Sequence, residues 1–171
     1  VALNGAVIAA PVYDAQTDSI FVGSLGNEFV RIDRQSGEIV WRYDGGGTLG
    51  SVWAKPIIVD GQVIFNDKTG KIISLSPETG LENWQFNAGG SQLAGLALIE
   101  GKGFVVALED GTVSFYNMDR QAIWSRSVSG NVYNTPVVTE TMILVGAIKG
   151  DNLVYAFDFQ GQPVWTFKPE K

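Results

Sequence analysis

The sequence contains no cysteine and no histidine. These two absences exclude disulfide bonds, thiol nucleophiles, every histidine-based catalytic triad and zinc sites of the usual kind. Basic residues are also few: 12 lysines and arginines stand against 18 acidic residues, for a net charge of −6, and they form no cluster. Because such a field repels a polyanion, the sequence argues against nucleic acid as a partner.

An apolar run of membrane-spanning length is also missing, and so is a basic segment followed by an apolar one at the start. We therefore expect this segment neither to insert into a membrane nor to carry its own export signal. Because the first residue is valine and not methionine, we expect an excised or processed piece of a longer chain.

What the sequence does contain is an internal repeat. Hydrophobic residues make up 45% of the 171 positions and glycine accounts for 21 of them, which indicates a folded, turn-rich protein. Four similar phrases end in tryptophan, with successive tryptophans 43, 40 and 41 residues apart. They are Trp41 in "RQSGEIVW", Trp84 in "PETGLENW", Trp124 in "DRQAIW" and Trp165 in "FQGQPVW".

A second sequence motif recurs with nearly the same spacing as the tryptophans. Four octads begin with glycine: "GAVIAAPV" at 5–12, "GSVWAKPI" at 50–57, "GSQLAGLA" at 90–97 and "GNVYNTPV" at 130–137. Three of them carry proline at the seventh place, where the third octad has Leu96. Two unrelated anchors with one period indicate true internal repetition.

Each repeat also holds four short runs rich in Val, Ile and Phe, bounded by turn residues, and no stretch keeps a helical period. Four strands repeated at this spacing are typical of a β-propeller blade. We predict an all-β propeller of four four-stranded antiparallel blades, forming one domain over residues 1–171. The predicted blades span approximately residues 5–49, 50–89, 90–129 and 130–171.

The order of these features resembles the repeat of the pyrroloquinoline quinone (PQQ) type propellers. The shared pattern is the octad with its proline, a hairpin of the form V-x-D-G-x-V-x-F, and a turn of the form D-x-x-[ST]-G-x-x-x-W. That superfamily includes the quinoprotein alcohol dehydrogenases and a non-enzymatic lipoprotein scaffold of the outer-membrane assembly machinery. The chain is closest in character to the scaffold branch, and the resemblance covers its whole length.

The resemblance implies a structural role for the repeated phrase, in which each tryptophan on an outermost strand docks between adjacent blades. Glycine supplies the positive φ that ends the turn before the tryptophan. The predicted docking residues are Trp41, Trp84, Trp124, Trp165, Gly37, Gly80 and Gly161. In the third blade, Arg120 takes the place of that glycine.

No residue pattern predicts chemistry. Known quinoprotein dehydrogenases hold PQQ on a tryptophan in the central channel, beside calcium, and that arrangement needs more than four blades. The turns at 67–70, 109–111 and 149–152 offer oxygens but lack the spacing of a calcium loop. We predict no catalytic residue, no metal site and no cofactor, and we keep PQQ with calcium as the alternative.

The fourth place of the octad differs from blade to blade. It holds Ile8, Trp53, Leu93 and Tyr133, which we expect to lie at one level near the starts of the innermost strands. One interpretation is that they fill a narrow channel. The other is that they line an aromatic mouth for a sugar, a peptide, another small ligand or a protein partner.

We predict a non-catalytic module for protein–protein interaction or scaffolding, with a protein as partner. The resemblance implies an extracytoplasmic location: periplasmic, cell-surface or tethered to a membrane. A PQQ-binding quinoprotein and a small-ligand or carbohydrate-binding propeller are the alternatives. Three arrangements stay open for the ring: four blades that close alone, two chains that pair as a homodimer into eight blades, or half of a longer parent.

Overall fold

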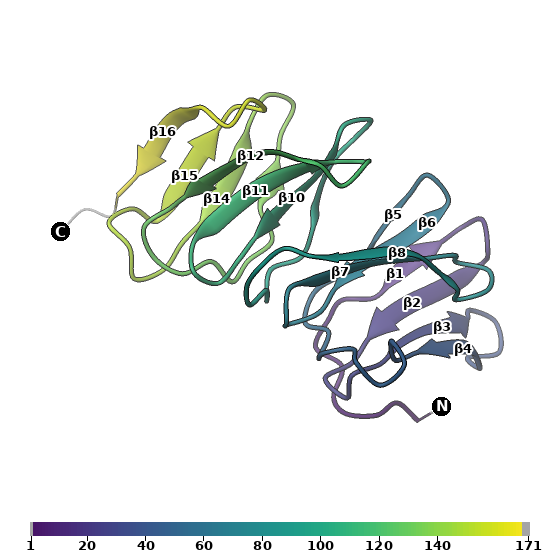
Figure 1. Ribbon diagram of the computed structural model, residues 1–171. Coiled ribbons are helices and arrows are strands. Elements are labelled where there is room, and N and C mark those ends of the chain that lie inside the picture. The colour runs from purple at the N-terminus through teal and green to yellow at the C-terminus, as the bar shows by residue number, and fades with distance from the viewer. Residues whose placement is uncertain (1, 169–171) are drawn as a thin grey trace. The chain divides into compact units, whose positions relative to one another are not determined.

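The computed structural model describes residues 2–168, which form strands and turns and contain no helix (Figure 1). Sixteen strands form four antiparallel sheets of four strands, and in each sheet the strands follow chain order. The predicted all-β fold of four four-stranded blades is confirmed. The chain divides into two compact units, residues 1–89 and 90–171. The prediction of one domain over the whole chain stays a prediction.

The first unit holds two blades. The first blade consists of β1 (Val12–Asp14), β2 (Ser19–Gly23), β3 (Phe29–Asp33) and β4 (Ile39–Tyr43). The second consists of β5 (Ile57–Val59), β6 (Gln62–Asn66), β7 (Lys71–Leu75) and β8 (Glu82–Asn87). The turn between β5 and β6 is Asp60-Gly61, and both residues have positive φ, 49° and 69°. That is the backbone of a type I′ hairpin, which explains a two-residue Asp-Gly turn between two apolar runs.

The second unit has the same plan. Its first blade consists of β9 (Ala97–Ile99), β10 (Gly103–Ala107), β11 (Thr112–Asn117) and β12 (Ala122–Ser127). Its other blade consists of β13 (Val137–Val138), β14 (Ile143–Gly146), β15 (Val154–Phe157) and β16 (Pro163–Phe167). In every blade the first strand begins at the last residue of the octad, and the tryptophan lies on the fourth strand.

The core of each unit lies between its two blades. In the first unit, Phe29 of β3 stacks on Phe65 of β6, with ring centroids 3.9 Å apart and ring planes 2° from parallel. In the second unit, Phe115 and Trp124 of one blade belong to the same buried cluster as Phe157 of the other. A four-stranded sheet has two faces to cover, so stacking on a neighbour buries what one blade exposes.

A β-bulge recurs at the tryptophan of every blade. The pairing between the third and fourth strands shifts register directly after the residue opposite the tryptophan: Arg31, Ser74, Phe115 and Ala156. The residue before each tryptophan is thereby left unpaired on the fourth strand. Bulges bend a strand and re-aim its side chains. The bulge therefore helps to direct each indole at this position.

The octads hold the blades together through the backbone. Val52 N donates to Ser24 O at 3.0 Å, which links the second blade to the first. At the same octad place, Val132 N donates to Glu109 O at 3.4 Å, which links the fourth blade to the third. Both valines are fully buried.

Candidate functional site

Trp41 docks on the turn of the following blade. Its Nε1 donates to the Pro77 carbonyl oxygen at 3.0 Å, and its ring lies beside Phe21 and Phe29. A Cβ placed on Gly80 would lie only 2.7 Å from Trp41 Cδ2. The glycine therefore forms the floor of the site that receives the indole, in addition to supplying a φ of 71°.

Trp124 makes the same contact in the second unit. Its Nε1 donates to the Phe159 carbonyl oxygen at 3.0 Å, and a Cβ on Gly161 would lie 2.6 Å from its Cδ2. The side chain is 7% exposed. A buried indole that satisfies its N–H is both a large apolar contact and a directional one.

The other two tryptophans are placed differently. The indole N–H of Trp84 donates to Gln62 Oε1 of its own blade at 3.0 Å. Trp165 on β16 is 43% exposed, and residues 2–168 provide no hydrogen-bond partner for its N–H. One repeated phrase thus has three different surroundings in the structure.

Arginines reinforce the two docked tryptophans. Arg31, which pairs with Trp41 across β3 and β4, donates from Nη1 to Glu78 O at 2.9 Å. Arg126, two residues after Trp124 on β12, donates from Nε to Gly161 O at 2.8 Å. Both guanidinium groups thus bind the turn on which the tryptophan rests. No repeated sequence signal marks these arginines, because they come from different strands of their blades.

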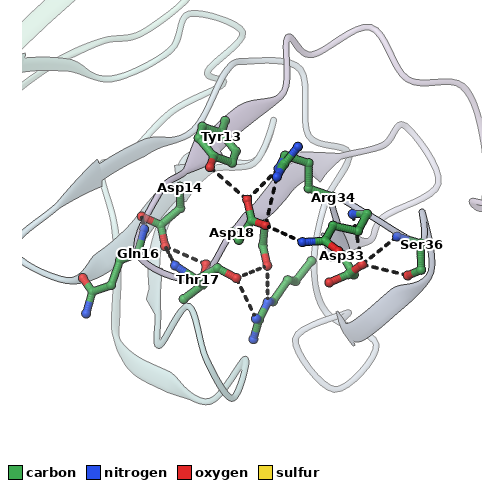
Figure 2. A network of polar contacts seen from close by, with 11 residues as sticks. Tyr13, Asp14, Gln16, Thr17, Asp18, Asp33, Arg34 and Ser36 are labelled. Carbon is green, nitrogen blue, oxygen red and sulfur yellow. Dashed lines mark hydrogen bonds and ion pairs between the residues drawn. The ribbon is translucent and has the colours of Figure 1, made fainter.

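The turn that contains Gly37 is held by a network of polar contacts, shown in Figure 2. Asp33 Oδ1 accepts bonds from Gln35 N at 3.1 Å and Ser36 N at 2.7 Å. Arg34 Nε donates to Asp18 Oδ1 at 2.6 Å. Residues 33–36 are therefore fixed to the β1–β2 hairpin.

Asp18 is the centre of that network. The Arg34 guanidinium, and after it the hydroxyl of Tyr13, hold the pKa of Asp18 down to about 2. Tyr13 donates its hydroxyl to Asp18 Oδ1 at 2.9 Å, and this bond raises the pKa of the tyrosine. The cluster is exposed, so its charges are screened and it serves to order the turn more than to stabilise the core.

Two octad residues predicted as binding residues lie in the first unit. Trp53 is half-buried, donates from Nε1 to Ser51 Oγ at 2.9 Å, and has Lys68 Nζ 5.6 Å from its ring centroid. That distance is within the range of a cation–π contact. Ile8 is 52% exposed.

The other two lie in the second unit. Tyr133 donates its hydroxyl to Glu109 Oε1 at 3.2 Å, while Ser91 Oγ donates to Glu109 Oε2 at 2.8 Å. Burial, and then the bond to Glu109, raise the pKa of Tyr133. Leu93 is half-buried. Trp53 and Tyr133 thus each have a charged neighbour, Lys68 and Glu109, which no sequence motif indicates.

Two of the buried carboxylates serve the turns. Asp67 accepts bonds from the backbone N–H groups of Gly50, Thr69 and Lys71. Asp14 does the same for its own turn through Thr17. Among residues 2–168, no group of three or more acidic side chains is placed to hold a metal ion. The same residues include no helix long and apolar enough to cross a membrane.

A groove of 570 Å³ opens beside the docked Trp124. Phe115, Ile123 and Phe159 give it an apolar wall, and Lys102 lies with Nζ 4.7 Å from the Phe159 ring centroid. No sequence motif indicates this groove, because it forms where two blades of the second unit meet.

The chain is similar in sequence and fold to known proteins. The sequence matches the family described as outer membrane protein assembly factor BamB, over residues 3–120 and again over 94–171. The chain belongs to the BamB family. The BamB of Shewanella oneidensis is 27% identical over 170 residues, which cover 94% of this chain and 41% of that protein. The chain therefore spans less than half the length of this BamB relative.

Solved structures agree on the fold. BamB from Moraxella catarrhalis superimposes with a TM-score of 0.80 at 16% identity, over 98% of this chain and 54% of that one. A quinohemoprotein alcohol dehydrogenase from Pseudomonas putida superimposes with a TM-score of 0.81 at 14% identity, over 98% of this chain and 35% of that one. At such identities the two structures establish the propeller fold that BamB shares with the dehydrogenase, and nothing about activity.

Proposed function

We propose that this chain is a non-catalytic propeller module that binds a protein partner, as a part of an outer membrane protein assembly factor. Membership of the BamB family supports the proposal, since the relatives are named for that role. The location that follows is extracytoplasmic, on the periplasmic side of the outer membrane. The module needs neither PQQ nor a metal for this role.

The structural observation that supports partner binding is the exposure of Trp53 and its contact with Lys68. A half-exposed indole with the Lys68 ammonium 5.6 Å from its ring centroid combines apolar area with a neighbouring positive charge. Tyr133, bonded to Glu109, offers an aromatic ring with the opposite charge. Aromatic residues of this kind supply most of the binding energy at protein interfaces. We assign partner binding to the octad residues, Ile8 and Trp53 in the first unit and Leu93 and Tyr133 in the second.

Site-specific photo-crosslinking in the bacterial envelope tests this assignment. A photoreactive residue replaces Lys55, an exposed residue two positions after Trp53, and in a matched control it replaces Glu140, which is also exposed. We expect Lys55 to cross-link a discrete protein of outer-membrane assembly, and Trp53→Ala to abolish that product. Equal products at the two positions would contradict the assignment.

Titration with PQQ and calcium tests the rival function. The dehydrogenase neighbour shares the fold, so the fold by itself favours neither function. We expect no saturable change in quinone absorbance on adding the protein, and no dye-linked alcohol oxidation. Stoichiometric binding together with oxidation would replace our proposal with a quinoprotein enzyme.

Pairing of two copies into an eight-bladed ring is part of the proposal. A scaffold built from repeats can extend through the same contact that joins its own repeats. The exposed Trp165 supplies the group for such a contact.

A further inference from the structure

The groove beside Trp124 is separate from the octad residues. Its volume of 570 Å³ is within the range of ligand-binding pockets in proteins. Its lining residues lie between positions 102 and 160, so the groove belongs entirely to the second unit. Phe115, Trp124 and Phe159 supply aromatic walls, and Ile123 supplies an aliphatic one.

Ile123 reaches the groove because of the β-bulge in β12. Phe115 pairs with Trp124 and Tyr116 pairs with Ala122, which leaves Ile123 out of the ladder. Its side chain is 53% exposed, although isoleucine is among the residues most often buried. In the sheets formed by residues 2–168, β12 is also the outermost strand of its blade. An extended segment of another protein can therefore lie along β12 and reach the groove.

The first unit has a guanidinium group at the equivalent junction between its blades. Arg31 lies opposite the docked tryptophan of its blade, as Phe115 does in the second unit. Its guanidinium bridges two blades, since Nη2 donates to Thr17 O at 3.3 Å and Nη1 donates to Glu78 O at 2.9 Å. Phe115 has no donor with which to make such a bridge, and the apolar groove lies beside it.

The cation of the groove is Lys102. Its Nζ lies 4.7 Å from the Phe159 ring centroid, within the range of a cation–π contact. Glu100 and Glu140 line a neighbouring pocket together with Lys102. Among residues 2–168, however, neither these two nor any other carboxylate forms an ion pair with it, and no acceptor takes a hydrogen bond from Nζ. The three N–H donors of the ammonium are therefore available to an anionic group of a ligand.

We propose that this groove binds an acidic peptide segment of a protein partner. An aromatic side chain of the segment lies between the rings of the groove, and the carboxylate of the adjacent residue binds the Lys102 ammonium. The occupant is a peptide because the outer edge of β12 offers room for an extended backbone beside the groove. This inference rests on the proposed function, since it names the chemistry of a second contact with a partner.

NMR titration of the isotope-labelled 171-residue chain with short peptides is the test. The probe is acetyl-Gly-Phe-Asp-Gly-amide, and two comparison peptides have Lys in place of Asp or Ala in place of Phe. We expect the probe to shift the indole N–H of Trp124 and the backbone amide of Gln160 saturably. Binding should weaken about tenfold or more without the phenyl ring, and about threefold or more when Lys replaces Asp.

Charge exchange at Lys102 separates direct binding from a structural effect. Lys102→Glu should reverse the preference, so that the Phe-Lys peptide binds more tightly than the Phe-Asp peptide. Lys149→Glu is the matched control, because it makes the same change in net charge at another exposed lysine of the second unit.

A second pair of variants tests the apolar wall. Ile123→Ser should weaken binding of the Phe-Asp peptide by about fivefold or more, because it removes an apolar contact from the groove. Val40→Ser is its control, since Val40 has the same place in the bulge of the first unit and is 49% exposed. We expect no change in affinity for this control.

Four results would overturn the inference. They are the absence of a saturable shift at Trp124, an Asp preference that persists in Lys102→Glu, and tighter binding of the Phe-Lys peptide to the parent chain. The fourth comes from phenylpropionate: if it binds as tightly as the Phe-Asp peptide, the occupant is a free aromatic acid and not a protein segment. The cross-link from Lys55 involves neither the groove nor Lys102, so the two proposals fail independently.

Discussion

Trp124 rests directly on Gly161, so closely that a Cβ on the glycine would lie 2.6 Å from the indole Cδ2. The glycine thus meets two demands at one position. It adopts a φ of 75°, which L-residues avoid, and it leaves room for a ring that binds the same turn through the Phe159 carbonyl. Loop shape and blade packing are therefore fixed by one residue.

Gly161→Ala should be more destabilising than its conformational strain explains. Strain at positive φ costs about 1 kcal/mol, and the clash with Trp124 adds about 1–3 kcal/mol. Gly101→Ala carries the strain alone, because its Cβ meets open space at a φ of 67°. Urea unfolding of the two variants measures the difference. Equal losses in the free energy of unfolding would show that the ring moves aside at little cost.

Trp124→Ala and Trp165→Ala should differ although the two tryptophans share one motif. Removing the buried Trp124 leaves a cavity and an unpaired Phe159 carbonyl, and should cost about 3–5 kcal/mol of unfolding free energy. Removing the exposed Trp165 should cost under about 1 kcal/mol in dilute protein. Denaturant titration at low protein concentration separates them, and similar losses would mean that Trp165 is buried in solution.

The sequence predicts the blades well because the residues that recur in each repeat determine the local backbone conformation. Glycine at a turn and alternating apolar residues determine strands whatever surrounds them, and the predicted four-stranded blades were confirmed. Even Arg120, which replaces the turn glycine in the third blade, adopts a φ of 66°. The turn thus has the same left-handed backbone conformation even where an arginine, which does not favour it, replaces the glycine.

The surroundings of the candidate site could not be predicted in the same way. The four tryptophans share one motif but differ in burial. The burial of each depends on the segment that packs against it, and the sequence of one repeat does not specify that segment. The Lys68 and Glu109 contacts, and the groove beside Trp124, arise where separate hairpins meet. Sequence spacing carries no information on such long-range pairs.

Gln92 is a buried polar residue at the octad place where the second and fourth octads bury valine. It is 0% exposed, as are Val52 and Val132 at the same octad place. Its Nε2 donates to Ala94 O at 3.2 Å, but its Oε1 has no hydrogen-bond partner among the described residues. An unsatisfied buried acceptor costs about 1–3 kcal/mol. Gln92→Val should therefore raise the free energy of unfolding by about 1 kcal/mol or more.

The reverse exchange is the control. Val52→Gln places an amide where the structure has a closely packed valine, with Gly23 against it, and should destabilise by more than about 2 kcal/mol. Thermal unfolding of both variants gives the comparison. A loss of stability in Gln92→Val would mean that its amide has a partner worth more than the apolar contact.

The Arg34–Asp18 pair makes the Gly37 turn sensitive to acid. The folded-state pKa of Asp18 is about 2, below its ordinary value of 3.8, so the carboxylate favours the folded state. That contribution is complete above about pH 4 and disappears as the pH falls through about 2. NMR titration should find the pKa of Asp18 raised toward 3.8 in Arg34→Gln, and raised less in Tyr13→Phe, because the guanidinium is the stronger influence. An Asp18 pKa that is the same in all three proteins would show that the ion pair does not order this turn in solution.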